Sequence, residues 1–166
     1  MYRQGLMHDL SKYSPIEFLT GARYWTGTES PNDGERRATG LSLAWLHHKG
    51  VNKHHLEYWL DYSRDKNAKF PIEGMKMPIK YVVEMFIDRV CACRNYMKDK
   101  YTDRSALEYY LKGRAFNIMH PDTAALLEKM LTLLAEKGED YTLKYIKKNI
   151  LTRKGSDYGK GYEDFV

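Results

Sequence analysis

The chain has 166 residues, of which 43% are hydrophobic and 30% are charged, and its formal net charge is +5. This length fits one domain with a single sizeable core. No apolar run approaches the roughly 20 residues that cross a bilayer, and the N-terminus lacks the apolar segment of a signal peptide, so we expect a cytoplasmic protein with no membrane contact. The two cysteines, Cys91 and Cys93, are predicted to be inert, half-buried thiols, which excludes a disulfide framework.

The first predicted helix runs from Ile16 to about Tyr24, after a loop or short helix. Ser14 fits the N-cap position, and Pro15 suits the first turn of a helix. Glu17, three residues after Ser14, would complete a capping box. The local pattern therefore gives Glu17 a role in starting this helix.

Glycine, proline and capping residues divide the next part of the chain. Residues 26–34 are rich in turn formers. A second helix is predicted over about residues 35–49, ending before Gly50, and a third helix begins after an N-cap at Asn52. Residues 63–77 are polar and contain proline and glycine, which predicts a loop of the kind that often borders a site.

The longest helical pattern covers about residues 78–99. Its apolar side chains recur at three- and four-residue steps on two faces, which is typical of a helix in the middle of a bundle. Asp88 lies on the second of these faces, between Met85 and Ala92. We therefore expect the Asp88 carboxylate to point inward.

Further helices are predicted at about residues 103–112, 121–137 and 140–149, and the polar, glycine-rich segment 154–166 is predicted to be a flexible tail. Neither a pattern of alternating strands nor an internal repeat is present. The sequence therefore predicts an all-α fold, a single-domain bundle of about six to seven helices within residues 1–153.

Histidine is concentrated in two short stretches of the chain. The first contains His8, and the second contains His47, His48, His54 and His55. Imidazole together with carboxylate is the usual ligand set for catalytic transition metals. Side chains of adjacent residues diverge by about 100° on a helix, so at most one histidine of each pair is expected to face a given ion. The remaining histidine, His120, precedes a proline and is predicted to lie at the start of a helix.

Residues 8–12, His-Asp-Leu-Ser-Lys, resemble the core motif of the HD superfamily of metal-dependent phosphohydrolases. The resemblance implies a helical bundle in which His8 and Asp9 ligate a metal ion and Asp88 supplies the final carboxylate from a later helix. The additional histidines found in two-metal subgroups would correspond to His47, His48, His54 and His55. Over residues 2–150 the chain is also similar to a bacterial family of uncharacterised HD-like proteins, which implies a fold and a site but no substrate.

HD proteins supply a further histidine from a helix upstream of the His-Asp pair. Only seven residues precede His8 in this chain. We therefore expect this first helix to be missing, with partial or no metal occupancy and low activity as a result.

The resemblance predicts hydrolysis of a nucleotide or another small phosphoester, with one or two divalent ions chosen from Mn, Mg, Co, Fe and Zn. Asp9 would be catalytic as a metal-bridging carboxylate, and Lys12 would contact a phosphate oxygen. Arg89 is a weaker candidate for the same contact.

Two alternatives remain open. One is a catalytically inactive HD-like module that binds metal, a ligand or another protein. The other is a basic helical protein that binds nucleic acid, with histidines that only cap helices and bond to aromatic side chains. The basic residues are scattered and no nucleic-acid motif is present, so nucleic acid is not the partner we expect.

Overall fold

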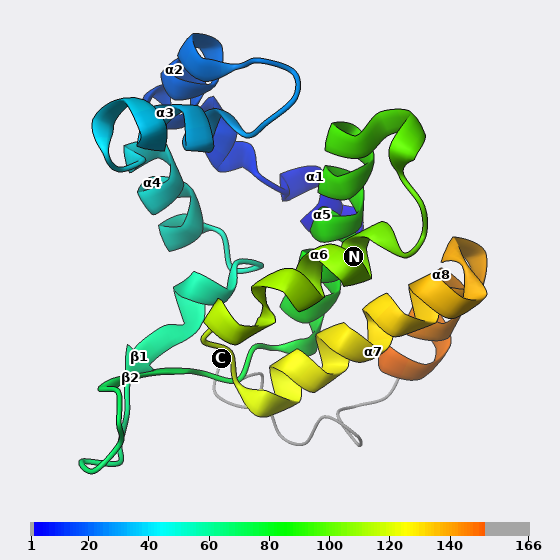
Figure 1. Ribbon diagram of the computed structural model, residues 1–166. Coiled ribbons are helices and arrows are strands. Elements are labelled where there is room, and N and C mark those ends of the chain that lie inside the picture. Colours follow the sequence, from blue (N-terminus) through cyan, green and yellow to red (C-terminus); the bar gives the residue numbers. More distant parts are fainter. Residues whose placement is uncertain (1, 152–166) are drawn as a thin grey trace. The chain divides into compact units, whose positions relative to one another are not determined.

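The computed structural model describes residues 2–151, which form helices and one small two-stranded sheet (Figure 1). The predicted all-α fold class is confirmed. Contacts within the chain divide it into two compact units. The boundary along the sequence lies between Tyr58 and Trp59. We refer to residues 2–58 as the N-terminal unit and to residues 59–151 as the C-terminal unit. The predicted tail at 154–166 lies outside the described residues.

The N-terminal unit consists of short helices. Its elements are α1 (Tyr2–Met7), the 3-10 turn η1 (Leu10–Tyr13), α2 (Pro15–Tyr24), α3 (Pro31–Thr39), α4 (Leu43–Val51) and the start of the 3-10 turn η2 (Leu56–Trp59). Helix α2 contacts both α3 and α4, and η1 contacts α2 and α4. This packing brings the segment after residue 8 against the end of α4.

The predicted start of α2 is confirmed, but its predicted capping box is wrong. Ser14 occupies the N-cap position, and its side chain makes no capping hydrogen bond. Glu17 turns away from the helix start, and its carboxylate accepts hydrogen bonds from two histidines of α4.

The single helix predicted over residues 35–49 is two helices. Helix α3 begins earlier, at Pro31, and ends at Gly40, whose φ of 84° only glycine adopts readily. Helix α4 then starts with its own cap, since the Ser42 hydroxyl accepts a hydrogen bond from the Trp45 amide at 3.0 Å. Gly40 and Ser42, two residues apart, were the local sequence signals for this break.

The helix predicted to begin after Asn52 is also wrong. Asn52 is the C-cap of α4, and its side-chain amide donates to the carbonyl oxygen of His48 at 2.9 Å. His54 and His55 consequently lie in a turn before η2 and not on a helix. The divergence of about 100° expected for adjacent helical residues does not apply to this pair.

The C-terminal unit contains the longer helices. Its elements are β1 (Leu60–Tyr62), β2 (Ile72–Gly74), α5 (Ile79–Met97), the 3-10 turn η3 (Lys98–Lys100), α6 (Ser105–Gly113), the 3-10 turn η4 (Arg114–Phe116), α7 (Pro121–Lys137), α8 (Glu139–Tyr145) and the π-helical turn η5 (Ile146–Ile150). The four helices predicted here are confirmed to within a few residues. Strand β2 lies in the predicted loop at residues 63–77, whereas β1 lies where the third helix was predicted to continue to Tyr62. Neither strand was predicted, because each is too short to carry an alternating pattern.

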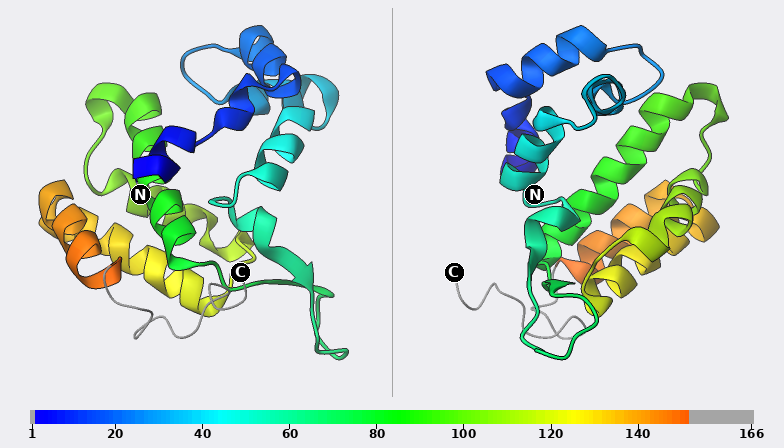
Figure 2. Two further views of the ribbon diagram at one scale, coloured as in Figure 1. Left: turned by 180° about the vertical axis from the view of Figure 1, so that it is seen from behind. Right: turned by 60° about the vertical axis from the view of Figure 1, so that its left-hand side comes forward.

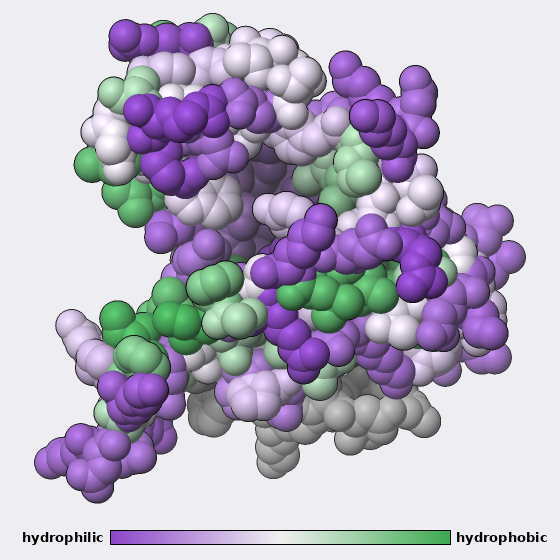
Figure 3. Space-filling view, viewed as in Figure 1, coloured by the Kyte–Doolittle hydropathy of each residue, from purple (hydrophilic) through white to green (hydrophobic). Residues whose placement is uncertain are grey.

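The two strands form an antiparallel hairpin in which Leu60 pairs with Gly74 and Tyr62 pairs with Ile72. Gly74 packs closely on the backbone of Met119 and His120, where a Cβ atom would approach to 2.7 Å. The far end of the hairpin carries mainly hydrophilic side chains (Figure 3).

A continuous apolar core fills the C-terminal unit. Helices α5, α6 and α7 contact one another, and α8 packs against α7 (Figure 2). Val82 and Phe86 of α5 and Leu127, Met130 and Leu131 of α7 are almost completely buried. No helix within residues 2–151 has both the length and the apolar character that crossing a bilayer requires.

The sequence also led to predictions for one histidine, His120, and for the two cysteines. His120 is the N-cap of α7, where its Nδ1 atom accepts a hydrogen bond from the Asp122 amide at 3.1 Å, so its predicted place at a helix start is confirmed. Cys91 and Cys93 are both free thiols, as predicted. Cys93 is partly buried, whereas Cys91 is exposed and not half-buried.

Candidate metal centre

Asp9 lies at the centre of the candidate site. It occupies the N-cap position of η1 with a φ of 55°, in the left-handed region that aspartate and asparagine tolerate better than other non-glycine residues. The residue is 7% exposed. A buried carboxylate in an unusual backbone conformation is a common feature of functional sites.

The two oxygens of the Asp9 carboxylate have different neighbours. Oδ2 lies 2.5 Å from Nζ of Lys12 and 3.3 Å from Nε2 of His8. Oδ1 lies 3.5 Å from Nε2 of His48 and 3.4 Å from Nε2 of His54. Among the described residues no hydrogen bond reaches the buried Oδ1 atom. The Oδ1 side of the carboxylate is therefore the side that faces imidazole nitrogens.

The pKa of Asp9 is well below its usual range. Burial alone raises this pKa, but hydrogen bonds from His8 and Lys12, together with the charge of Lys12, outweigh the effect of burial. Asp9 is consequently ionised at neutral pH. Because the Lys12 ammonium group pairs with Oδ2, this lysine is tied to the site although most of its side chain is exposed.

Four side chains of the N-terminal unit could hold a metal ion together. Asp9, His48, His54 and His55 each offer one ligand atom, and these atoms all lie within 4.8 Å of one another. His48 and His54 are buried, and His55 is half-buried. The ring centroids of His54 and His55 are 4.2 Å apart. Both members of this pair join the group, contrary to the expectation of one per pair, because they lie in a turn.

Two separations between these atoms match those of a four-coordinate ion. Ligands bound at about 2.0–2.1 Å to a tetrahedral ion lie roughly 3.3–3.4 Å from one another. The separations of 3.4 Å and 3.5 Å between Asp9 Oδ1 and the two imidazole nitrogens are close to this value. A set of three imidazoles and one carboxylate also suits zinc and other first-row transition metals.

The two histidines at the end of α4 have different surroundings. His48 belongs to the group around Asp9. His47 lies outside this group, and its Nδ1 atom donates to Oε1 of Glu17 at 2.6 Å. Because adjacent residues on a helix face different directions, only one of this pair meets Asp9, as expected.

Glu17 is the residue of the site that the sequence did not reveal. Its carboxylate is 8% exposed and also accepts a hydrogen bond from Nδ1 of His48, at 2.7 Å. The capping-box pattern offered a sufficient local reason for a glutamate at this position. Its partners lie 30 and 31 residues away, and no sequence spacing distinguishes a glutamate that will meet them.

Neighbouring side chains hold the His48 ring in place. The Asn52 amide donates to the Ser11 hydroxyl at 2.7 Å, which ties the end of α4 to η1. The indole of Trp45 stacks on the His48 ring with a centroid distance of 5.8 Å. These contacts restrict rotation of the His48 imidazole.

Asp88, the predicted distant ligand, lies on α5 in the C-terminal unit and is half-buried. It lies near the buried residues Met85, Phe86 and Val90, which belong to the apolar core. Its role as a ligand of the same ion stays a prediction. Arg89 is also half-buried.

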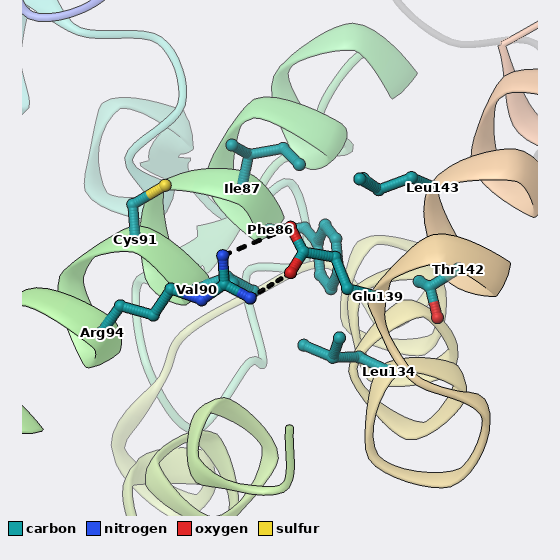
Figure 4. A pocket seen from close by; sticks show the side chains of 9 residues that line it. All are labelled: Phe86, Ile87, Val90, Cys91, Arg94, Leu134, Glu139, Thr142 and Leu143. Carbon is teal, nitrogen blue, oxygen red and sulfur yellow. Dashed lines mark hydrogen bonds and ion pairs between the residues drawn. The ribbon is translucent and has the colours of Figure 1, made fainter. Parts of the chain in front are cut away.

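The C-terminal unit also contains a pocket of its own. It is lined mainly by apolar side chains of α5, α7 and α8, including Phe86, Val90 and Leu134 (Figure 4). Arg94 and Glu139 form an ion pair beside them. The lining offers no combination of groups for acid–base or metal chemistry, so we assign it no function.

The fold and the site define a helical protein with a candidate His/Asp metal centre. A sequence model of a protein family, described as "Family of unknown function (DUF5662)", matches residues 1–133. The chain belongs to this family. No curated protein and no solved structure matches the chain. Because the family description gives no activity, the function has to be argued from the site.

Proposed function

We propose that the chain is a divalent-metal-dependent phosphohydrolase that acts on a nucleotide or another small phosphoester. The observation that carries the proposal is the buried Asp9 carboxylate, whose Oδ1 atom faces imidazole nitrogens at the spacing of metal ligands. The choice of reaction rests on the resemblance of residues 8–12 to the HD motif.

The residues of the site have distinct parts in this proposal. His48, His54, His55 and Asp9 Oδ1 would bind one ion, and Asp88 would supply the additional carboxylate that the resemblance implies. A bound divalent ion would lower the pKa of a water molecule and neutralise charge on phosphoryl oxygens. The Lys12 ammonium group already neutralises Oδ2, which favours one ion over two. Its exposed charge is suited to hold a phosphate oxygen.

Metal binding by the purified protein tests the first half of the proposal. We expect the protein to bind Zn²⁺ or Co²⁺ and expect Asp9→Asn and His54→Ala to weaken this binding by at least about tenfold. Asparagine tolerates the left-handed backbone at position 9, so Asp9→Asn removes the charge without adding strain. The matched control is His120→Ala, which removes a histidine that only caps α7. Absence of binding by the wild-type protein would defeat the proposal.

Hydrolysis of phosphoesters by the purified protein tests the second half of the proposal, which is the reaction. A panel of phosphomonoesters and nucleotides should be assayed with added Mn²⁺, Co²⁺ or Mg²⁺, and we expect hydrolysis that Asp9→Asn abolishes. Asp88→Asn should also lower the rate if Asp88 is a ligand. A His120→Ala control should retain the wild-type rate.

A second candidate function is a metal-binding module without catalytic activity. It is favoured by the observation that the N-terminal unit alone offers four protein ligands. Four protein ligands are typical of structural zinc sites, whereas catalytic sites keep one position open for water. Tight metal binding without turnover of any phosphoester would select this candidate over the hydrolase.

A further inference from the structure

The contacts of Glu17 have a consequence for how the proposed ion would be bound. We propose that Glu17 is a positioning residue that fixes the orientation and tautomer of His48, so that His48 binds the ion through Nε2. This inference rests on the metal site of the proposed function, but not on phosphoester hydrolysis.

The first step concerns the proton on the His48 ring. An ionised carboxylate can only accept hydrogen bonds, and a neutral imidazole carries a single N–H. Glu17 Oε2 lies 2.7 Å from Nδ1 of His48, which is the distance of a strong, charge-assisted hydrogen bond. Nδ1 therefore carries the proton, and Nε2 of a neutral ring presents its lone pair.

The other contacts of Nδ1 are weaker than the contact with Glu17. Ser11 Oγ lies at 3.2 Å, and Asn52 Nδ2 lies at 3.1 Å. The Asn52 amide nitrogen is itself a donor and is directed to the Ser11 hydroxyl and to the His48 carbonyl oxygen. Of these three neighbours, Glu17 is the closest and the one that carries charge.

The second step concerns the opposite edge of the same ring. Nε2 of His48 faces Oδ1 of the ionised Asp9 at 3.5 Å, a distance at which no hydrogen bond is formed. Two lone pairs that face each other in a buried place repel, and a cation between them satisfies both. Glu17, His48 and the ion would then form a carboxylate–histidine–metal triad, an arrangement that orients metal-binding histidines in many proteins.

His47 fixes the carboxylate of Glu17 in turn. Its Nδ1 atom donates to Oε1 at 2.6 Å, while His48 occupies Oε2. With one imidazole on each oxygen, the buried carboxylate has a defined rotation about its last bond. The two adjacent histidines thus have separate roles, one toward the ion and one toward Glu17.

The first test measures the affinity for Co²⁺ by visible absorption, in Glu17→Gln and Glu17→Met variants. An amide is a weaker acceptor and a thioether is barely one, so we expect the affinity to fall by about ten- to a hundredfold, more for methionine than for glutamine. The matched control is Glu35→Gln. Glu35 also holds the start of α4, because its Oε2 atom accepts from Ser42 Oγ at 2.6 Å and from the Ala44 amide at 3.3 Å. This control should keep the wild-type affinity.

The second test uses proton NMR of the Co²⁺-loaded protein in water. The ion shifts the N–H resonance of each bound imidazole far from the other signals, and an N–H held by a buried carboxylate exchanges slowly with solvent. We expect the His48 Nδ1–H resonance in the wild-type protein and in His47→Ala. In Glu17→Met this resonance should broaden or disappear, whereas a merely structural role of Glu17 would leave it in place.

The outcomes separate the two proposals. A wild-type protein that binds no Co²⁺ would defeat the metal site itself, and the role of Glu17 with it. Wild-type binding with unchanged affinity and unchanged N–H resonances in both Glu17 variants would overturn only the role of Glu17. Equal losses of affinity in Glu17→Met and Glu35→Gln would also overturn it, because they would show a general dependence on the packing of α4.

Discussion

The interiors of the two units differ in chemical character. In the N-terminal unit the buried side chains are mostly polar or charged: Asp9, Glu17, Thr20, Ser42, His48 and His54. The buried apolar residues there, within residues 2–58, are Ala44 and Leu56. The C-terminal unit instead buries a cluster of large apolar side chains on α5, α6, α7 and η5. The candidate metal centre is thus the interior of one unit, whereas hydrophobic packing is the interior of the other.

This difference indicates that the two units are stabilised in different ways. Burial of apolar surface contributes roughly 25 cal/mol per Å², and the N-terminal unit gains little of it. Phe18, Leu19, Trp25 and Leu46 are each at least half exposed. We therefore expect the N-terminal unit to depend on its buried hydrogen bonds and on neutralisation of Asp9, and a metal ion bound there would also drive folding.

The largest expected effect on stability tests whether burial of apolar side chains stabilises the C-terminal unit more than the N-terminal unit. Leu127 is fully buried on α7, so Leu127→Ala should lower the free energy of unfolding by about 2–5 kcal/mol. The same truncation at Leu46, which is half exposed on α4, should cost less than about 1 kcal/mol. Urea denaturation measures both values. Equal costs at the two positions would contradict the proposed difference between the interiors.

The second-largest expected effect on stability tests whether a metal ion stabilises the N-terminal unit. At a free Zn²⁺ concentration a hundredfold above its Kd, the ion should stabilise the folded state by about 2.7 kcal/mol. Hydrogen exchange followed by mass spectrometry should show the added protection mainly in residues 2–58. Asp9→Asn should remove it. Protection that rises equally in both units, or that persists in Asp9→Asn, would argue against metal-coupled folding of the N-terminal unit.

The sequence predicted the C-terminal unit better than the N-terminal unit for the same physical reason. Apolar side chains that form a core recur at helical spacing, so the patterns of α5 and α7 are visible in the sequence. The N-terminal unit has little such pattern, and its helices are set by single residues such as Gly40 and Ser42. The prediction placed the end of the second helix at Gly50 and passed over Gly40, so it gave one helix where the chain forms two.

The site was predictable in its residue types but not in its geometry. The sequence predicted a set of seven candidate metal ligands: His8, Asp9, His47, His48, His54, His55 and Asp88. Of these, the structure of the N-terminal unit brings Asp9, His48, His54 and His55 together in a group that could hold a metal ion. The separate surroundings of His47 and His48 depend on ring orientation, and both rings are hydrogen-bonded to Glu17. Such contacts join residues about thirty positions apart, and no local pattern records them.

A smaller effect is expected from a single polar contact in the N-terminal unit. Ser42→Ala removes the cap of α4 and the hydrogen bond to Glu35, which should cost about 1 kcal/mol. Ser30→Ala is the comparison, because Ser30 caps α3 through a longer hydrogen bond of 3.3 Å to the Asn32 amide. Thermal unfolding should rank Ser42→Ala as the more harmful change. The reverse order would mean that the start of α4 is held by something other than its cap.

The smallest effect tests whether polar contacts matter as little in the C-terminal unit as the comparison implies. Lys76 Nζ lies 2.6 Å from Asp122 Oδ2, and its hydrogen bond lowers the pKa of Asp122. A carboxyl group with a lowered pKa stabilises the fold above its ordinary pKa, and this contribution is lost as the pH falls below it. Asp122 is 52% exposed, so solvent screening should hold the cost of Asp122→Asn below about 1 kcal/mol at pH 7.

The measurement for this last prediction is the difference in Tm between wild type and Asp122→Asn from pH 7 down to pH 3. The wild-type protein should be slightly more stable at pH 7, and the difference should shrink as Asp122 takes up a proton. Asparagine at the same position still fits the first turn of α7, so the comparison isolates the charge. A difference that widened in acid would give the pKa shift the opposite sign. A cost as large as that of Leu127→Ala would mean that a surface ion pair, and not the apolar core, holds the C-terminal unit together.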